Sequence, residues 1–463
     1  VDCCMVFSSL LFLFRFLPIA LLIYYLMPRK GKNFALLVLS MIFYAWGEVR
    51  YLPIMVVSIL VDYFCGQGIK RWGQKPALRR MFLIFSMVLN LGMLFFFKYT
   101  NFFLENISAI TGLALPQLSL TLPLGISFYT FQTMSYTIDV YRGKVEAEDN
   151  IIDFGAFVVL FPQLIAGPIV KYSDVAYELK HRQMETGRMA EGVRLFIMGL
   201  ASKVLIANNV GALWTEIEGL SMTDISTPLA WLGALAFSLQ IYFDFSGYSL
   251  MAIGLGKLLG FDFPQNFNYP YISPSITDFW RRWHMTLSSW FREYLYIPLG
   301  GNREGKWKTY RNMLIVWAAT GFWHGASWNF VLWGLFFFVM LVLEKAWLAP
   351  HMARHQGISR VWVLFLLLCS WMLFAITDLG RLGEYFTRMF VPQGGGNWLY
   401  YLRNYGVSLV LGCVLSVPVL KKFYDKWLCR HRWVETVLLG GLLTLSVAYL
   451  VDATYNPFLY FRF

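Results

Sequence analysis

The sequence contains few charged residues for its length. Aspartate, glutamate, lysine and arginine account for 14% of the 463 residues, whereas hydrophobic residues account for 58%. Soluble domains contain about 25% charged residues. Because so little charge does not cover the surface of a soluble protein, the composition excludes a soluble enzyme with a short anchor and predicts a chain embedded in a membrane.

Several motifs of soluble enzymes are absent as well. The chain has no glycine-rich loop ending in Lys-Ser or Lys-Thr, no Cys-x-x-Cys pair and no Gly-x-Ser-x-Gly elbow, which disfavours ATP-driven transport and serine hydrolysis. The cysteines lack the spacing of metal ligands, so we predict no metal site and interpret them as packing residues of apolar helices. They are Cys3, Cys4, Cys65, Cys369, Cys413 and Cys429.

Long apolar runs recur along the whole chain. A helix needs about 17 to 20 residues to cross a bilayer, and ten runs approach or exceed this length: residues 10–27, 34–47, 52–66, 82–97, 191–209, 229–253, 328–346, 360–377, 405–420 and 434–452. Glycine, proline or polar residues interrupt four further stretches, at 101–115, 121–138, 153–169 and 312–324. The pattern predicts an all-α integral membrane protein with about ten or eleven transmembrane helices plus re-entrant and interfacial helices.

The apolar runs follow one another without an internal repeat, a low-complexity tract or a long linker. We therefore predict a single polytopic membrane domain over residues 1–463. The first run is too long for a signal peptide and lacks a cleavage site of small residues, so we expect it to be retained as a span. Met5 is interpreted as the true start, with Val1 to Cys4 as an upstream extension.

The net charge of +12 arises from basic residues in short loops between the apolar runs. Such loops stay on the cytoplasmic side of a membrane, which explains the charge better than nucleic-acid binding, so we predict no nucleic-acid partner. The main basic loops lie at 29–32, 70–80 and 421–432. With these loops inside, the N-terminus lies outside and residues 257–311 form an interfacial segment on the cytoplasmic side.

Aromatic and leucine residues in this segment recur at steps of three and four: Trp280, Trp283, Leu287, Trp290 and Tyr294. The spacing predicts one amphipathic helix over 276–296, with His284 and the neighbouring arginines on its remaining surface. Paired glycines and an asparagine, Gly300-Gly301-Asn302, then favour a turn that ends the helix.

Two histidines lie among aromatic residues. His284 ends the run Phe279-Trp280-Arg281-Arg282-Trp283-His284, and His324 lies within Gly321-Phe322-Trp323-His324-Gly325. A side chain that exchanges protons is costly inside a membrane and is by default a hypothesis about function. The structural alternative is a hydrogen-bonded histidine that ties helices together, and the residues alone leave both interpretations open.

These two motifs, with Tyr294-Leu295-Tyr296-Ile297-Pro298-Leu299-Gly300-Gly301-Asn302-Arg303 between them, closely resemble the membrane-bound O-acyltransferase family. Within the family, the resemblance is to the bacterial branch of alginate O-acetyltransferase membrane subunits and related polysaccharide acetylation proteins. Agreeing stretches extend over nearly the full chain, at residues 5–9, 161–169, 244–248 and 456–461.

The resemblance implies a ring of helices around a central funnel, where an acyl group from the cytoplasmic side meets a hydroxyl acceptor. It implies that His324 lies at the catalytic centre and that His284 is a second functional position. It also implies acetyl-CoA as acyl donor, no bound cofactor, a polysaccharide acceptor, an extracytoplasmic acetyltransferase partner protein, and a place in the inner or plasma membrane of a bacterium. The expected activity is O-acetyl transfer towards an exopolysaccharide or cell-wall glycan, as in alginate O-acetylation.

The chemistry of the residues agrees with these roles. Ester formation on a hydroxyl requires a base, and a histidine with a pKa near 7 is suited to this task. Burial among Phe322, Trp323 and Trp328 is expected to keep His324 neutral. His284 could orient the donor, relay a proton or stabilise a developing oxyanion. No nucleophile for an acyl-enzyme is evident, so we expect direct transfer or relay through a partner.

Glycines flank His324, and supporting residues surround both motifs. Gly321 and Gly325 would allow close approach of backbone or substrate. The candidates for substrate binding or support are Asp244, Arg281, Arg282, Trp323, Asn302 and Gln163.

Three of these candidates have structural alternatives. Asp244 interrupts an apolar run and must find a partner or stay protonated; it could line the funnel, support a histidine or make a structural hydrogen bond. Arg281 and Arg282 could bind a phosphate-bearing donor or contact lipid headgroups. Gln163 is expected in a re-entrant or broken segment, where irregular backbone must be buried or face a cavity.

Two alternative functions remain open from the sequence. One is transfer of D-alanyl or another acyl group to teichoic acid, which uses the same hydroxyl chemistry. The other is a polytopic transporter, in which His324, His284 and Asp244 would form a proton or substrate pathway and no ester would be made. The absence of an evident inverted repeat disfavours many transporter designs.

Overall fold

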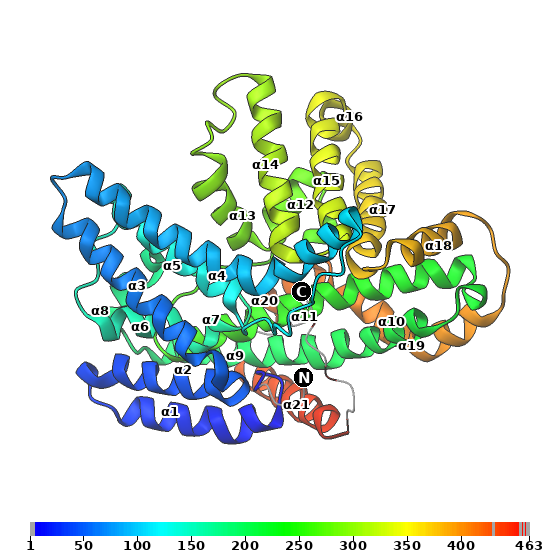
Figure 1. Cartoon of the computed structure of the whole chain (residues 1–463). Coiled ribbons are helices and arrows are strands. Elements are labelled where there is room, and N and C mark those ends of the chain that lie inside the picture. The colour runs from blue at the N-terminus through cyan, green and yellow to red at the C-terminus, as the bar shows by residue number, and fades with distance from the viewer. Residues whose placement is uncertain (1–4, 428–430, 453–455, 457–458, 460–463) are drawn as a thin grey trace. The chain divides into compact units, whose positions relative to one another are not determined.

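The computed structural model describes residues 5–427, 431–452, 456 and 459. Every regular element assigned within these residues is helical, which confirms the predicted all-α class (Figure 1). The proposed extension at residues 1–4 lies outside the described part, as do most of residues 456–461.

Seven helical stretches in the described residues are long and apolar enough to cross a membrane. They are Arg29–Arg71, Pro76–Thr111, Thr186–Gly219, Thr227–Leu258, Trp328–Arg354, Gln356–Ala375 and Arg432–Asp452. An eighth span results if Asn397–Leu415 and Val419–Lys426, which meet at a bend of 68°, are counted together.

The number of spans is smaller than the number of apolar runs in the sequence for two reasons. The runs at 34–47 and 52–66 form two helices, Lys32–Glu48 and Leu52–Arg71, which count as one stretch, Arg29–Arg71, because only a short 3-10 turn separates them. The backbone leaves the helical conformation at Glu48, with φ −146° and ψ 52°. The first run forms only a short apolar helix, Phe12–Leu26. Apolar periodicity identifies helices, but it does not by itself decide how many separate spans they make.

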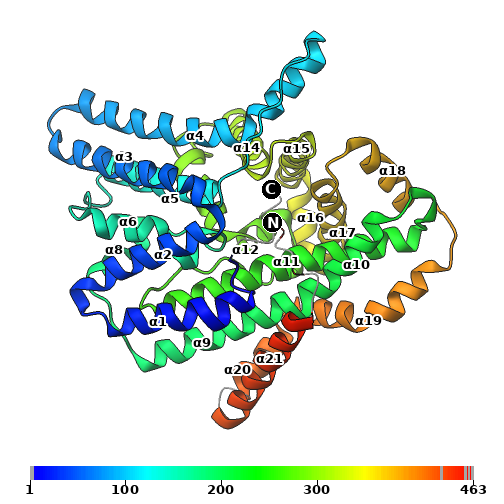
Figure 2. The same cartoon turned by 60° about the horizontal axis from the view of Figure 1, so that its bottom comes forward.

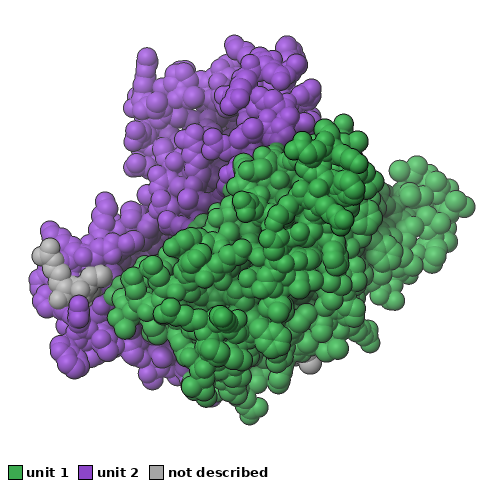
Figure 3. Space-filling model, turned by 90° about the vertical axis from the view of Figure 1, so that its left-hand side faces the viewer, with its two compact units in different colours: residues 1–196, 251–264 green, residues 197–250, 265–463 purple. Residues whose placement is uncertain are grey.

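The chain divides into two compact units, coloured separately in Figure 3. Unit 1 comprises residues 1–196 and 251–264, and unit 2 comprises residues 197–250 and 265–463. Two helices, α9 (Thr186–Ala201) and α11 (Thr227–Leu258), begin in one unit and end in the other.

Unit 1 contains a series of helices that pack as neighbouring pairs. They are α1 (Leu17–Leu26), α2 (Lys32–Glu48), α3 (Leu52–Arg71), α4 (Pro76–Thr111), α5 (Ile126–Arg142), α6 (Ile151–Val159), α7 (Phe161–Leu164) and α8 (Tyr172–Lys180). Helices α3, α4 and α5 pack against one another, and α2 packs against α6.

A buried carboxylate joins α3, α4 and α5. Asp62 of α3 accepts hydrogen bonds from the Ser86 hydroxyl and from Asn90 Nδ2, which lies 3.0 and 2.9 Å from its two oxygens. The Thr137 hydroxyl of α5 lies 3.4 Å away. All four side chains are fully buried, so these neutral donors replace the water that a carboxylate loses inside an apolar bundle.

The segment around Gln163 is broken, in agreement with the sequence prediction. Helix α6 ends at Val159, α7 covers only Phe161–Leu164, and irregular backbone follows. The whole stretch is buried, and Gln163 Nε2 donates to the carbonyl of Phe157 at 2.6 Å. The freed backbone is thus enclosed by protein, as membrane-embedded irregular structure requires.

Unit 2 holds the remaining helices. They are α10 (Asn208–Gly219), α12 (Ile276–Arg282), α13 (Met285–Phe291), α14 (Lys306–His324), α15 (Trp328–Leu343), α16 (Ala349–Arg354), α17 (Gln356–Ala375), α18 (Leu379–Phe390), α19 (Asn397–Leu415), α20 (Val419–Lys426) and α21 (Arg432–Asp452). Helices α10 and α19 lie side by side in Figures 1 and 2, and the Tyr405 hydroxyl of α19 donates to Glu216 of α10.

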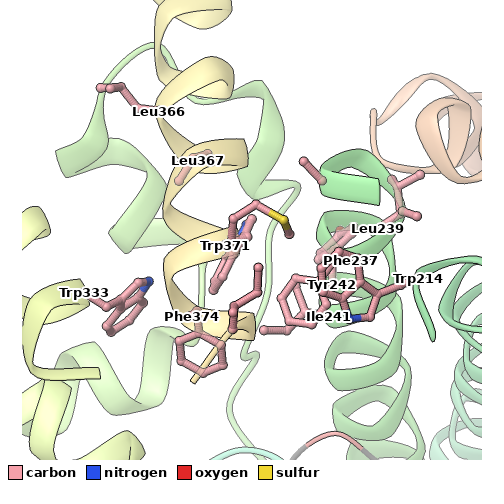
Figure 4. Close-up of a cluster of buried hydrophobic side chains, with 14 of the residues drawn as sticks. Trp214, Phe237, Leu239, Ile241, Tyr242, Trp333, Leu366, Leu367, Trp371 and Phe374 are labelled. Carbon is pink, nitrogen blue, oxygen red and sulfur yellow. The ribbon is translucent and has the colours of Figure 1, made fainter. Parts of the chain in front are cut away.

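The core of unit 2 is rich in large aromatic side chains. Figure 4 shows Trp371 and Phe374 of α17 between Trp333 of α15 and Tyr242 of α11. The ring of Trp333 lies 5.2 Å from that of Phe374 and 6.3 Å from that of Trp371. Such rings give a rigid wall because each fixes the orientation of its neighbours.

The prediction of one continuous helix over 276–296 is wrong. Helix α12 ends at Arg282, and α13 begins at Met285. Between them, His284 adopts a left-handed backbone conformation with φ 42° and ψ 56°. His284 therefore does not lie on the polar surface of an amphipathic helix; only 1% of its surface is exposed.

Candidate functional site

His324 lies at the last residue of α14, where the chain turns sharply into α15. Gly321 and Gly334 allow these two helices to approach closely: a Cβ atom at Gly321 would lie 2.5 Å from the Phe330 carbonyl oxygen, and one at Gly334 would lie 2.4 Å from that of Trp317. Ridges of larger residues hold packed helices about 8 to 10 Å apart. The expected close approach of backbone at Gly321 is thus present.

The imidazole of His324 is enclosed by aromatic rings. Its ring centre lies 5.0 Å from Trp323, 5.0 Å from Trp333 and 5.4 Å from Phe374, each in an edge-to-face arrangement. His324 is 4% exposed. Trp328, expected from the sequence to bury it, is instead 50% exposed, whereas α15 and α17 supply the buried rings.

His284 lies at the break between α12 and α13. Its left-handed backbone costs on the order of 1–3 kcal/mol for a residue other than glycine, and such strain concentrates at functional sites. The Phe245 ring of α11 packs edge-on at 4.7 Å. The break directs the histidine into the interior of unit 2 and away from the polar face of the two short helices.

The side chain of Asn266 is hydrogen-bonded to the imidazole ring of His284. Its Oδ1 lies 3.0 Å from His284 Nδ1. The same oxygen accepts from the Thr286 backbone nitrogen at 3.4 Å and from the Thr286 hydroxyl at 2.9 Å. Asn266 Nδ2 donates to the Ser249 hydroxyl at 3.0 Å, so α11 also supports the amide.

The two histidines share Trp323 as a neighbouring ring. The Trp323 ring lies 6.1 Å from His284 and 5.0 Å from His324, and it is buried. Burial, and secondarily the charge of His324, lowers the pKa of His284 well below its ordinary value. His284 is therefore neutral at physiological pH. The structure brings together three predicted site residues, His284, Trp323 and His324.

Asp244 forms a buried ion pair with a lysine. Lys203 Nζ lies 2.8 Å from Asp244 Oδ1, and each side chain is 2% exposed. The other carboxylate oxygen accepts from the Leu459 backbone nitrogen at 2.9 Å. Lys203 also donates to Asn208 at 2.7 Å, and Asn208 donates to Asn456 at 3.1 Å.

This network explains the apolar position of Asp244. Of the roles that the sequence left open, the contacts fit a structural one, because they join α11 to the backbone of Leu459. Phe245, the next residue, contacts His284. The ion pair of Asp244 therefore lies next to the residue of α11 that packs on the histidine.

The two arginines of α12 differ in their contacts. Arg282 pairs with Asp278 one turn earlier at 2.7 Å and lies 3.4 Å from the Asn268 carbonyl oxygen, whereas Arg281 is exposed.

Asn302 is exposed and lies in a turn directly after Gly301. The backbone φ angles of Gly300 and Gly301 are 102° and 59°, which confirms the predicted turn. Asn312 holds this turn by donating to the Gly301 carbonyl at 2.9 Å.

Gln163 belongs to unit 1, apart in sequence from the other candidates. Its Nε2 bonds to the Phe157 carbonyl, and its buried Oε1 has no hydrogen-bond partner among the described residues. Gln163 remains a candidate for substrate support only because this oxygen could accept a hydrogen bond from a substrate.

Sequence reasoning missed four residues of the arrangement. Asn266 and Lys203 orient charged or polar groups, while Trp333 and Phe374 enclose His324. A lysine within the apolar run 191–209 and an asparagine in the segment 257–311, where charge density rises, were visible signals. The two rings carried no signal, since aromatic residues are abundant throughout the chain.

The fold and these contacts define a multi-pass membrane protein with two buried histidines in an aromatic enclosure. A family model described as "MBOAT, membrane-bound O-acyltransferase family" matches residues 148–375, which include both histidines. Together with relatives that match nearly the full chain, this shows that the protein belongs to the membrane-bound O-acyltransferase family and is an O-acyltransferase.

Two groups of relatives are similar over most of the chain. The probable alginate O-acetylase AlgI of Azotobacter vinelandii is 42% identical over 435 residues, which cover 91% of this chain and 86% of the relative. The peptidoglycan O-acetyltransferase of Helicobacter pylori is 34% identical over 99% of this chain and 98% of its own length. A teichoic acid D-alanyltransferase of Streptococcus thermophilus is more distant, at 29% identity over 49% of this chain and 57% of the relative.

A substitution at Gly321 is expected to disturb the site through the backbone. In Gly321→Ala the new methyl group would collide with the Phe330 carbonyl, so α14 and α15 must separate and His324 must shift. Overpacking of this kind destabilises by about 1–3 kcal/mol. We expect a lower thermal unfolding midpoint in detergent and lower transfer activity.

Gly440→Ala in α21 provides the matched control, because a Cβ atom at Gly440 meets nothing within 4 Å. Its activity should equal that of the unchanged protein, and its midpoint should be equal or slightly higher, because alanine favours a helix interior by about 1 kcal/mol over glycine. Equal midpoints for Gly321→Ala and Gly440→Ala would show that the close approach at Gly321 is unimportant.

Proposed function

We propose that this protein transfers an acetyl group from a cytoplasmic thioester, acetyl-CoA, towards hydroxyl groups of an exopolysaccharide or cell-wall glycan. The observation that carries the proposal is the pair of buried histidines, His284 and His324, which both contact the Trp323 ring. The similarity to relatives named as O-acetylases of alginate and peptidoglycan supports acetyl as the group and a glycan as the acceptor.

His324 acts as the general base in this proposal. It takes the proton from the acceptor hydroxyl while the hydroxyl oxygen attacks the thioester carbonyl. The carbon–sulfur bond breaks and an ester forms. The leaving thiolate then takes up the proton that His324 carries. The aromatic enclosure keeps water away, which protects the thioester from hydrolysis.

Arg281 and Arg282 are the proposed contacts of the donor on the cytoplasmic side. Arg281 is exposed, and guanidinium groups bind phosphate in bidentate fashion. Contact with lipid headgroups is the alternative use of the same charges. Asn302, Gln163 and Trp323 are proposed as supporting residues in substrate binding.

The final acceptor lies outside the cytoplasm, so we propose an extracytoplasmic acetyltransferase as partner protein. The protein would span the inner or plasma membrane of a bacterium as one polytopic domain, with residues 257–311 at the cytoplasmic interface. Transfer would pass directly to the glycan or through the partner.

Ester content of the cell glycans tests this function. A strain that lacks the protein but keeps its native neighbouring genes should lose alkali-labile acetate from one glycan, and a restored copy should return it. The fraction that loses acetate identifies the acceptor. Unchanged esters in all glycan fractions, with transport of an unmodified solute lost instead, would favour the transporter alternative.

D-alanyl transfer to teichoic acid is the second candidate, on the observation that teichoic acid D-alanyltransferases are similar over part of the chain. The two candidates differ in the released acid. Alkali treatment should release acetate under the first proposal and D-alanine under the second.

A further inference from the structure

The side-chain amide of Asn266 has a defined orientation in the interior of unit 2. Its oxygen faces the Thr286 backbone nitrogen, which can only donate a hydrogen bond. Its nitrogen faces the Ser249 hydroxyl at 3.0 Å. Asn266 is 1% exposed, so water does not compete for either atom.

This orientation determines the hydrogen position on His284. Asn266 Oδ1 is an acceptor and lies 3.0 Å from His284 Nδ1, so Nδ1 must carry the hydrogen and donate it. A neutral imidazole has one hydrogen on nitrogen, so Nε2 then holds a lone pair. Nε2 is buried and has no hydrogen-bond partner among the described residues.

We propose that Asn266 is a positioning residue that fixes His284 as the Nδ1–H tautomer and thereby presents Nε2 as a proton acceptor. The inference rests on the proposed acyl transfer and sharpens the role of its second histidine. A neutral ring with this tautomer cannot stabilise an oxyanion through Nε2, because that atom has no hydrogen to donate. His284 therefore accepts a proton or hydrogen bond from the reacting groups or from a relay.

Other ionisable groups lie on the elements around His284, and two of the carboxylates among them are paired. His324 of α14 is the titratable group that acts on His284. Asp244 of α11 pairs with Lys203, and Asp278 of α12 pairs with Arg282. The remaining such groups on α11, α12 and the helical segment after α13 are Tyr242, Tyr248, Lys257, Arg281, Arg292, Glu293, Tyr294 and Tyr296.

The proposal predicts a change in pH dependence for Asn266→Asp. A carboxylate at this position would favour the imidazolium form and raise the pKa of His284, by about 1–3 units for an adjacent opposite charge. If neutral His284 is the active form, the acidic limb of kcat/KM should move to higher pH by about one unit or more. At low pH the variant should thus lose activity that it partly regains as pH rises.

Asn266→Ala supplies a second measurement. It leaves the buried Nδ1 hydrogen without an acceptor, so the ring can exchange tautomers or turn. We expect a loss of about 10- to 100-fold in kcat/KM, since an unpaired buried donor weakens the correct arrangement by that factor. The assay follows transfer of labelled acetyl in membranes at matched protein abundance.

Asn268→Asp is the matched control. It makes the same chemical change two residues away, at an exposed position, and its pH profile should coincide with that of the unchanged protein. An Asn266→Asp profile that also coincides would overturn the positioning role, and movement of the alkaline limb alone would assign His284 as a proton donor. If the unchanged protein transfers no acyl group, it is the proposed function that fails.

Discussion

Replacement of His324 with alanine is expected to lower acyl transfer by about 10²- to 10⁴-fold, the usual contribution of a general base. His324 is the buried imidazole at the end of α14, and Trp323, Trp333 and Phe374 enclose it. None of these three rings can accept a proton in its place. The measurement is labelled acetyl transferred to the acceptor glycan, at matched abundance of protein in the membrane.

Two further variants separate chemistry from packing. His351→Ala removes an exposed histidine of α16 and should leave transfer unchanged. Phe374→Leu opens space in the wall of the enclosure while keeping the imidazole, so it should cost far less activity than His324→Ala. Transfer by His324→Ala at more than a tenth of the unchanged rate would exclude His324 as the base.

The two histidine motifs could be recognised in the sequence because their information is local. Gly321 and His324 are three residues apart, and the same helix positions both. The sequence predicted the aromatic enclosure of His324 and one of its members, Trp323, but not the other two. Trp333 and Phe374 reach it from α15 and α17, and periodicity gives no information on which helices become neighbours.

The break at His284 shows a different limit of the sequence. The spacing of Trp280, Trp283 and Leu287 fits one apolar face, and each short helix does bury its aromatic residues. The break covers only two residues, so the spacing of the aromatic residues stays close to that of one helix and does not reveal the break. At the break, His284 contacts Asn266, eighteen positions earlier in the chain, and local spacing does not encode such a contact.

Asp244 illustrates the limit for charge. The sequence required a partner for a carboxylate in an apolar run, but it did not identify which residue. Lys203 is 41 positions away, and helix α10 lies between the two residues along the chain. Pairing across such distances depends on helix packing, which local spacing does not encode.

Lys203→Met is expected to destabilise the protein by about 3–5 kcal/mol, because it leaves a buried carboxylate without its counter-charge. The pair is almost fully buried, and Asp244 also holds the Leu459 backbone nitrogen, so the C-terminal contact should weaken at the same time. We expect a markedly lower thermal unfolding midpoint in detergent and lower abundance in the membrane.

The double variant Lys203→Met/Asp244→Leu distinguishes the effect of an uncompensated buried charge from the effect of altered packing. Replacing both partners removes the uncompensated charge, so it should recover much of the stability that Lys203→Met loses. Lys308→Met, which breaks an exposed pair with Glu304 at 2.7 Å, should cost at most about 1 kcal/mol. A Lys203→Met midpoint equal to that of Lys308→Met would mean that the Asp244 carboxylate is not charged in the folded protein, since only a charged group requires the lysine.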